Sequence, residues 1–462
     1  MSSEADAPAI SSPGVIDEAK MLQSVMRLAW PVVVQQVSFS MVQLVDTALV
    51  GHLGEDALAG VRLAGQLFWF SQAGIIAVSV GATAIVARSV GAGRRDEASH
   101  VLQSAFVLAL AWGLLMAFGM WFLGDHWLRL MGTETAAREA GAEFLRAVAI
   151  GMPFTALMFA GNAAQQGAGD TRTPMIVGLV INVVNVIVAY SLINGTGPAP
   201  ELGVTGSGLG FSVSAITGCA LVFGVLISGV RELRWSPREV REFNPTLAGR
   251  LLNVGVPAGV EQVQFNIAFM IYTAIIVSLG TTALAAHGVT LAIQSLTFNV
   301  GFALSVATSA LVGQSLGAGR PDLAERAANL TTRYSIAFML SLALIMMLLG
   351  EQITSLFVGG EDADEVSHIG GDLLFIFAFA MPGLAVSLSL GGALRGAGDT
   401  RSVLYIMAGC TWIVRLVPAY LLAITLGLGV PGAWLAAIMD ISVRAVLMYF
   451  RFRQGKWKYI KV

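Results

Sequence analysis

Charged side chains are scarce in this sequence. Asp, Glu, Lys and Arg together make up 12% of its 462 residues, against 56% for the hydrophobic types. Because soluble domains carry about 25% charged residues, this composition excludes a soluble globular protein. Apolar segments of about 20 residues, the length that a helix needs to cross a bilayer, recur along the whole chain. The sequence therefore predicts an all-α integral membrane protein.

Cysteine is nearly absent, and the signatures of several chemistries are missing. Cys219 and Cys410 lie in apolar stretches, which excludes a disulfide framework or a cysteine-ligated metal site. The phosphate-binding pattern GxxxxGK[ST] does not occur, so ATP-driven transport by this chain is excluded. No Ser/His/Asp constellation or metal-ligand cluster indicates an enzyme or a cofactor. A net charge of −2 gives no indication of a nucleic-acid partner.

Twelve membrane spans are predicted from the apolar runs and the breaks between them. Residues 1–21 are polar and lack the basic start and short apolar core of a signal peptide, so they are expected to be a disordered tail. The spans are expected at roughly 22–48, 57–85, 97–120, 134–162, 171–195, 202–229, 247–278, 282–310, 324–350, 363–388, 401–426 and 431–453.

The connections between spans predict how the chain is divided and oriented. A polar, basic stretch, 230–246, separates six spans in 22–229 from six in 247–453, and a basic tail, 454–462, follows. Arginines gather in alternate connections and are few in the others, and basic loops face the cytoplasm. Both termini are therefore expected to be cytoplasmic. The arginine-rich connections include Arg88, Arg94, Arg95, Arg172, Arg320, Arg395 and Arg401.

The two halves are copies of one another. The segment from Pro31, "PVVVQQVSFSMVQLVDTA", aligns with "PAGVEQVQFNIAFMIYTA" from Pro257, and the same offset of 226 residues brings "SVGAGRRDEA" onto "SLGAGRPDLA". The connector "GAGDTR" also occurs in each half, at 167–172 and 396–401. Because each half holds an even number of spans, both enter the membrane in the same orientation. Two parallel six-helix bundles with pseudo-twofold symmetry are predicted, an arrangement typical of secondary transporters.

Two carboxylates stand where the copies differ. Inserting an ionisable side chain at the centre of a span costs about 2.5–3.5 kcal/mol, so each such residue is expected to have a structural or functional role. Asp46 in the first span corresponds to Tyr272 in the repeat, and it is the first candidate for binding H⁺ or Na⁺. Glu261 in the seventh span corresponds to Gln35. Glu261 is a candidate for binding substrate or ion, or for a salt bridge with an arginine of a neighbouring span.

Other polar and proline residues within the spans have predicted roles. Asp440 and Arg444, four residues apart on one helical face, are expected to form a structural ion pair that Arg415 could join. Amide side chains are further candidates for lining the substrate path, and the prolines at the start of the repeat are candidate conformational hinges. The amide residues are Gln36 and Gln262, and the prolines are Pro31 and Pro257.

The sequence resembles the multidrug and toxic compound extrusion (MATE) family over nearly its whole length. The most specific similarities are "LVDTALVGHLG" in the first span, "GAGRRDEA" after the second, "GAGDTR" in each half and "GAWLAAIMDISVRAVLMYFRFRQGKWK" near the end. The resemblance implies an antiporter that exports organic, often cationic, compounds in exchange for H⁺ or Na⁺. It requires no cofactor, and no metal other than Na⁺ at Asp46, if Na⁺ is the coupling ion.

The resemblance also implies an ion site, which is only partly present here. The aspartate of the family's first span matches Asp46, and an asparagine of the fifth span matches Asn185. The position four residues later, where the family has an acid or amide, is Ala189, and a threonine of the sixth span falls on Phe211. The glutamate that some branches place in the seventh span would fall on Phe265, one turn after Glu261.

These observations favour a cation-coupled multidrug antiporter working by alternating access in the plasma membrane. Its expected partners are small organic substrates and membrane lipids, and it is expected to be monomeric. The alternative is a flippase or exporter of a lipid-linked or other amphipathic metabolite. That alternative requires a wide, basic cavity, and few intramembrane arginines are available for one.

Overall fold

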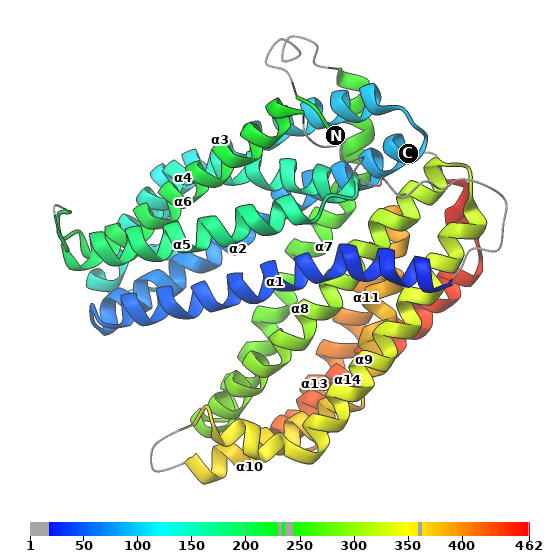
Figure 1. The fold of residues 1–462 in the computed structure, drawn as a ribbon. Coiled ribbons are helices and arrows are strands. Elements are labelled where there is room, and N and C mark those ends of the chain that lie inside the picture. Colours follow the sequence, from blue (N-terminus) through cyan, green and yellow to red (C-terminus); the bar gives the residue numbers. More distant parts are fainter. Residues whose placement is uncertain (1–17, 198, 230–232, 236–243, 359–362, 461) are drawn as a thin grey trace.

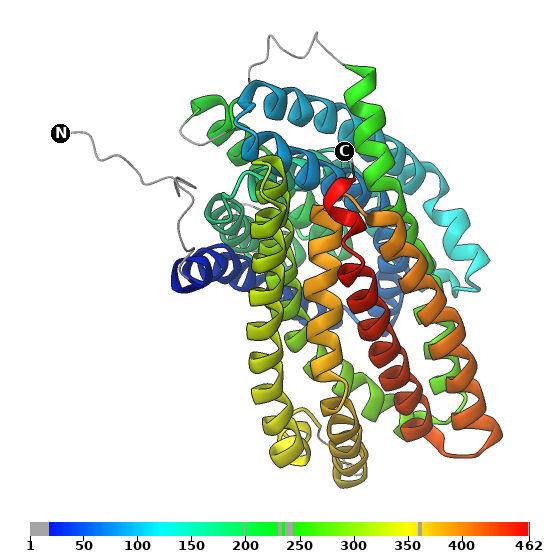
Figure 2. The same cartoon turned by 90° about the vertical axis from the view of Figure 1, so that its right-hand side faces the viewer.

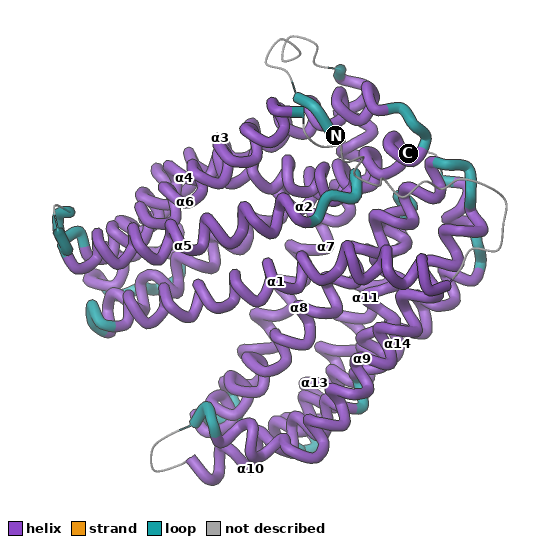
Figure 3. Tube along the Cα trace, viewed as in Figure 1, coloured by secondary structure: helices purple, strands orange, loops and turns teal. Residues whose placement is uncertain are grey.

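The structure, a computed structural model, consists of helices joined by short connections. It describes residues 18–197, 199–229, 233–235, 244–358, 363–460 and 462. Within these ranges no strand is present (Figure 3). The expected disorder of residues 1–17 and most of the expected linker lie outside the described residues. Residues 18–21, expected to belong to the tail, instead begin the first helix.

Six long helices form the first bundle. All six are longer than the roughly 20 residues that a helix needs to span a bilayer. Most of them extend beyond the apolar runs from which the spans were predicted. They are α1 (Glu18–Gly51), α2 (Glu55–Gly91), α3 (Arg95–Leu130), α4 (Thr135–Gly167), α5 (Arg172–Asn194) and α6 (Gly203–Ser228).

The second bundle repeats this order with two irregular spans. Its helices are α7 (Pro245–Val277), α8 (Thr281–Gly317), α9 (Pro321–Ser355), α10 (Ala363–Ala378), α11 (Met381–Gly396), α12 (Thr400–Gly409), α13 (Val417–Tyr420) and α14 (Gly429–Arg453). Two π-helical segments, η2 (Cys410–Leu416) and η3 (Leu421–Thr425), continue α12, and a 3₁₀ turn, η4 (Lys456–Tyr459), follows α14.

Eleven stretches of the described chain are long and apolar enough to cross a membrane, and the bent pair α10–α11 is a twelfth. The prediction of one continuous helix over 363–388 is wrong, because α10 and α11 meet at an angle of 54° and α11 runs on to Gly396. Pro382, in the first turn of α11, has no N–H to continue the hydrogen bonding of the preceding helix. The all-helical class and the number of spans are otherwise as predicted.

The two bundles meet at one end of the molecule and diverge towards the other (Figures 1 and 2). The connections α2–α3, α4–α5, α8–α9 and α11–α12 and the segment after α14 lie at the meeting end, which we call the connector side. There α2 packs on α7 and α8, and α8 packs on α1. The α1–α8 contact buries apolar side chains of both helices, among them Leu28, Ala29, Leu304 and Ala307.

Glycine allows the helices of the two bundles to touch backbone to backbone. A Cβ atom on Gly255 of α7 would lie 1.9 Å from the carbonyl oxygen of Ala77 in α2. A Cβ atom on Gly81 of α2 would lie 2.5 Å from the carbonyl oxygen of Leu251. No larger residue fits either position unless α2 and α7 move apart.

We predict that Gly255→Ala destabilises the protein, because the added methyl group forces α2 and α7 apart at a cost of about 1–3 kcal/mol. Gly249→Ala, in the same helix, is the matched control, since nothing lies within 4 Å of a Cβ atom there. The control is expected to be neutral or stabilising through its higher helix propensity. Thermal unfolding in detergent, followed by circular dichroism, measures both. Equal melting temperatures for the two variants would contradict the close contact.

Candidate functional site

The carboxylate of Asp46 lies near the far end of α1, half-buried against α5 and α6. In the amide orientation that satisfies both neighbours, Asn185 Nδ2 donates to the two carboxylate oxygens at 3.1 and 3.2 Å, and Asn185 Oδ1 accepts from the Phe211 N–H at 3.2 Å. The structure therefore brings together the two residues predicted for ion coupling.

The amide of Asn185 suits a carboxylate that changes its charge. With Asp46 ionised, the NH₂ group of Asn185 donates to it. With Asp46 protonated, an amide rotated by 180° accepts the carboxyl hydrogen through its oxygen, since an amide has both donors and acceptors, at the cost of its bond to the Phe211 N–H. Asn185 is buried, so its orientation is decided by these protein partners.

Close packing of α5 on α6 explains why Ala189 stands where a larger polar residue was expected from the family pattern. A Cβ atom on Gly210 of α6 would lie 2.7 Å from the Cβ atom of Ala189. This contact brings the Phe211 N–H to Asn185. The ring of Phe211 packs edge-on against Phe68, with their centroids 5.3 Å apart. Neither Ala189 nor Phe211 supplies a side-chain oxygen to the site.

Two further amides hold α1 between the bundles. Asn182 of α5 donates to Ser38 Oγ at 2.9 Å, and Asn299 of α8 donates to Ser40 Oγ at 3.0 Å. The first bond is within the N-terminal bundle, while the second crosses to the other bundle. Both lie on the stretch of α1 between Pro31 and Asp46, so a bend at Pro31 would strain or break them.

Glu261 does not belong to the ion site. It is buried on α7, and Arg395 at the end of α11 donates to its Oε1 at 2.6 Å. Of the two roles considered for Glu261, the geometry supports the salt bridge with a neighbouring span. From the sequence, Arg395 was placed in a connection between two spans. Nothing in the sequence indicated that its side chain reaches back into the bundle.

The residues predicted as a structural ion pair do come together. Arg444 donates to both oxygens of Asp440, at 2.8 and 2.6 Å, and also lies 3.3 Å from Thr411 Oγ1. Arg415 Nε lies 2.8 Å from Asp440 Oδ2, although its N–H is not aligned for a hydrogen bond. The Arg415 guanidinium also lies over the ring of Tyr272, 5.9 Å from its centroid. Asp440 is fully buried, so two cations share one carboxylate inside the C-terminal bundle.

The remaining candidates lie along the helices that join the bundles. Gln262 donates to Asn266 Oδ1 at 3.0 Å, and Asn266 lies 3.4 Å from the carbonyl oxygen of Trp69 in α2. The carbonyl of Gln36 accepts from Ser40. Pro31 and Pro257 both lie inside helices, α1 and α7, where proline removes a backbone hydrogen bond.

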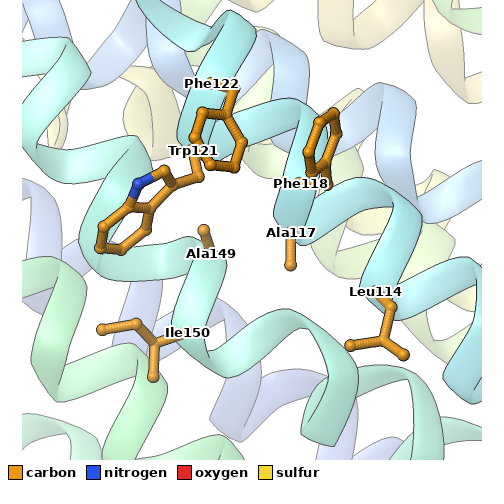
Figure 4. Close-up of a pocket in the computed structure, with 7 residues that line it drawn as sticks. All are labelled: Leu114, Ala117, Phe118, Trp121, Phe122, Ala149 and Ile150. Carbon is orange, nitrogen blue, oxygen red and sulfur yellow. The ribbon is translucent and has the colours of Figure 1, made fainter.

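An apolar hollow of about 430 Å³ lies elsewhere, between α3 and α4 (Figure 4). Its walls include the exposed side chains of Phe118, Phe122 and Ile150. Exposed apolar side chains of this kind suit contact with lipid chains, and no polar side chain lines the hollow. We therefore do not assign the hollow to the ion site.

Comparison with known proteins gives a consistent result. The family model MatE matches residues 31–191 and 257–421, one match in each half. A probable multidrug resistance protein NorM of Thermotoga maritima is 29% identical over 445 residues, covering 94% of this chain and 93% of its own. An uncharacterized transporter, YisQ, of Bacillus subtilis is 25% identical, covering 94% of both chains.

Solved structures share the fold. The MATE transporter VcmN of Vibrio cholerae superposes with a TM-score of 0.88 at 18% identity, covering 96% of this chain and 99% of its own. A MOP superfamily transporter from Pyrococcus furiosus gives a TM-score of 0.87 at 20% identity, covering 97% and 100%.

We predict that Asp440→Asn destabilises the C-terminal bundle by about 3–5 kcal/mol, because it leaves two buried guanidinium groups without a counter-charge. Asp322→Asn is the control, since it removes the carboxylate of an exposed pair with Arg320 and such pairs contribute little. Urea or thermal unfolding in detergent compares the two variants. If Asp440→Asn were as stable as the control, Asp440 would not be the counter-ion of this cluster.

Proposed function

The chain belongs to the MATE family of membrane transporters, and on that premise we propose that it exports organic, often cationic, compounds in exchange for H⁺. Membership makes it a multi-pass transporter rather than an enzyme. Its relatives are named for multidrug resistance. The proposal adds the substrate charge, the coupling ion and the residues that bind this ion.

The observation that carries the proposal is the hydrogen-bonded pair of Asp46 and Asn185. Glu261 and Asp440 in the other bundle are neutralised by arginines. Among the described residues, Asp46 has an amide, Asn185, as its partner in place of a cation. A carboxylate held in this way remains able to bind and release a cation, which is what ion coupling requires.

We favour H⁺ over Na⁺ because the side chains around Asp46 supply few oxygens. The carboxylate and one amide are available, whereas Ala189 and Phe211 contribute none. A dedicated Na⁺ site needs a fuller shell of oxygen ligands, while a proton needs a single carboxylate oxygen and an acceptor for its hydrogen bond. Asp46 and Asn185 provide both.

We propose that the connector side faces the cytoplasm of a cell whose plasma membrane holds the protein, with both termini on that side. The arginines of the alternate connections support this orientation. The conformation described is then closed towards the cytoplasm, with its bundles diverging towards the exterior (Figure 1).

In the proposed cycle, protonation of Asp46 from the outside changes its bond to Asn185 and moves the outer half of α1. Pro31 provides the hinge, and the bonds of Ser38 and Ser40 to Asn182 and Asn299 transmit the movement to α5 and to α8 of the other bundle. The moved helix releases the exported compound. Transport is coupled because H⁺ binds one conformation more tightly than the other.

The structure offers little support for the alternative, a flippase for a lipid-linked phosphate. Such a substrate needs free arginine or lysine side chains in the cavity. Arg395, Arg415 and Arg444, on helices of the second bundle, all lie against carboxylates.

We predict that Asp46→Asn abolishes H⁺-driven efflux while the protein remains folded, because asparagine cannot take up the coupling proton. Asp125→Asn, which removes the partner of Arg129 and Arg138, is the control and is expected to transport normally. Dye efflux from vesicles, measured with a pH gradient and with a Na⁺ gradient in turn, tests the proposal. Wild-type rates in Asp46→Asn would refute the site, and efflux driven by Na⁺ alone would refute the choice of ion.

A further inference from the structure

The repeated connector GAGDTR has roles that its local chemistry explains only in part. Gly169 and Gly398 turn the chain with φ values of +93° and +86°. Asp170 accepts from the backbone N–H groups of Arg172 and Thr173, each at 3.1 Å, at the start of α5. These roles account for the second glycine of each connector and for the aspartate of the first. They do not account for the contacts that the connector carbonyls make with the opposite bundle.

Each connector accepts a hydrogen bond from the other bundle. Gln314 Nε2 of α8 donates to the carbonyl oxygen of Gly167 in the first connector at 2.9 Å. Arg88 Nη2 of α2 donates to the carbonyl oxygen of Ala397 in the second connector at 3.4 Å. The two donors are equivalent residues of the repeat, since they are 226 positions apart. The donors are therefore related by the pseudo-twofold symmetry, while the acceptors are the first residue of one connector and the second residue of the other.

The same symmetry governs the contact between α2 and α8. A Cβ atom on Gly91 would lie 2.0 Å from the carbonyl oxygen of Gln314, and one on Gly317 would lie 2.1 Å from the carbonyl oxygen of Arg88. Gly91 and Gly317 are again equivalent positions of the repeat. The two helix ends thus cross with their backbones in contact, and the residues that reach the connectors are located at this crossing.

Residues 456–460 and Val462, after α14, add a further bridge to α2 and α7. Arg88 Nη1 donates to the carbonyl oxygen of Ile460 at 2.6 Å, and Arg250 Nη2 donates to the main-chain oxygen of Val462 at 2.5 Å. Arg250 also pairs with Glu97 of α3 at 3.1 Å. Trp457 is fully buried and stacks on Phe452, with their centroids 4.9 Å apart. The tail predicted only to be basic is therefore packed between the bundles.

We propose that Arg88 and Gln314, docked on the two GAGDTR connectors, form the gate that closes the connector side, and that the described residues after α14, 456–460 and Val462, are a strap that reinforces it through Arg88. The proposal rests on alternating access, because the gate must open when the bundles rock to the other conformation. Gln314 donates to a connector, whereas Arg88, at the equivalent position, donates both to a connector and to the strap. This difference makes Arg88 the stronger half of the gate.

A distance measurement across the gate tests the proposal without requiring transport. Ala92 and Ala318 are exposed, equivalent positions just after α2 and α8, and each is replaced by a spin-labelled cysteine in the full chain in lipid nanodiscs. We expect Arg88→Ala with Gln314→Ala to raise the ratio of long to short distances at least about tenfold, because three bonds of the closed state are lost. Asp125→Asn, which removes an ion pair with Arg129 and Arg138 near the end of α3 away from the connectors, is expected to leave the distances unchanged.

Arg88→Gln copies the equivalent residue of the other half. This variant should keep the hydrogen bond to the connector and lose the bond to the strap, so its ratio of long to short distances should be intermediate. It replaces the double variant in the test if the double variant does not fold. Unchanged distances in folded double and Arg88→Gln variants would overturn the gate, and equal opening in Asp125→Asn would show general loosening instead. If the distances respond as expected but wild-type vesicles show no H⁺-driven efflux, the proposed function fails while the gate stands.

Discussion

The free energy of burying a charge in the membrane is the constraint on which this structure depends. An ionised side chain away from water must be paired or must exchange its charge. In the C-terminal bundle the buried charges are paired: Arg395 lies against Glu261, and two arginines lie against Asp440. The N-terminal bundle gives Asp46 an amide instead. One duplicated fold thus contains a bundle whose intramembrane carboxylates meet arginines and a bundle whose intramembrane carboxylate, Asp46, meets an amide.

Much of this arrangement could be predicted from the sequence because it is periodic or repeated. The length of the apolar runs indicated the spans, and alignment of the two repeats showed that the halves differ at Asp46. The pairing of Asp440 with Arg444 followed from helical spacing. The break at Phe379–Ala380, the reach of Arg395 to Glu261 and the contacts between bundles could not be predicted, because they depend on packing between residues far apart in the chain.

Small residues decide how closely the helices approach, and hence which polar groups meet. Gly210 against Ala189 brings the backbone of α6 to Asn185, and Gly255 against Ala77 brings α7 to α2. A sequence shows that such residues are small but not what they touch. The loss of a side-chain oxygen at position 189 looks like a defect of the ion site from the sequence. In the structure it is the condition for a backbone N–H to take part in that site.

The burial of Trp457 has a consequence for how the protein is made. Residues 456–462 follow both bundles along the chain, yet their binding partners include Arg88, in the second helix to leave the ribosome. The first bundle therefore waits, through the synthesis of the entire second half, for contacts that complete its own surface. Arg88 therefore gains its bond to Ile460 only after α14 has been synthesised.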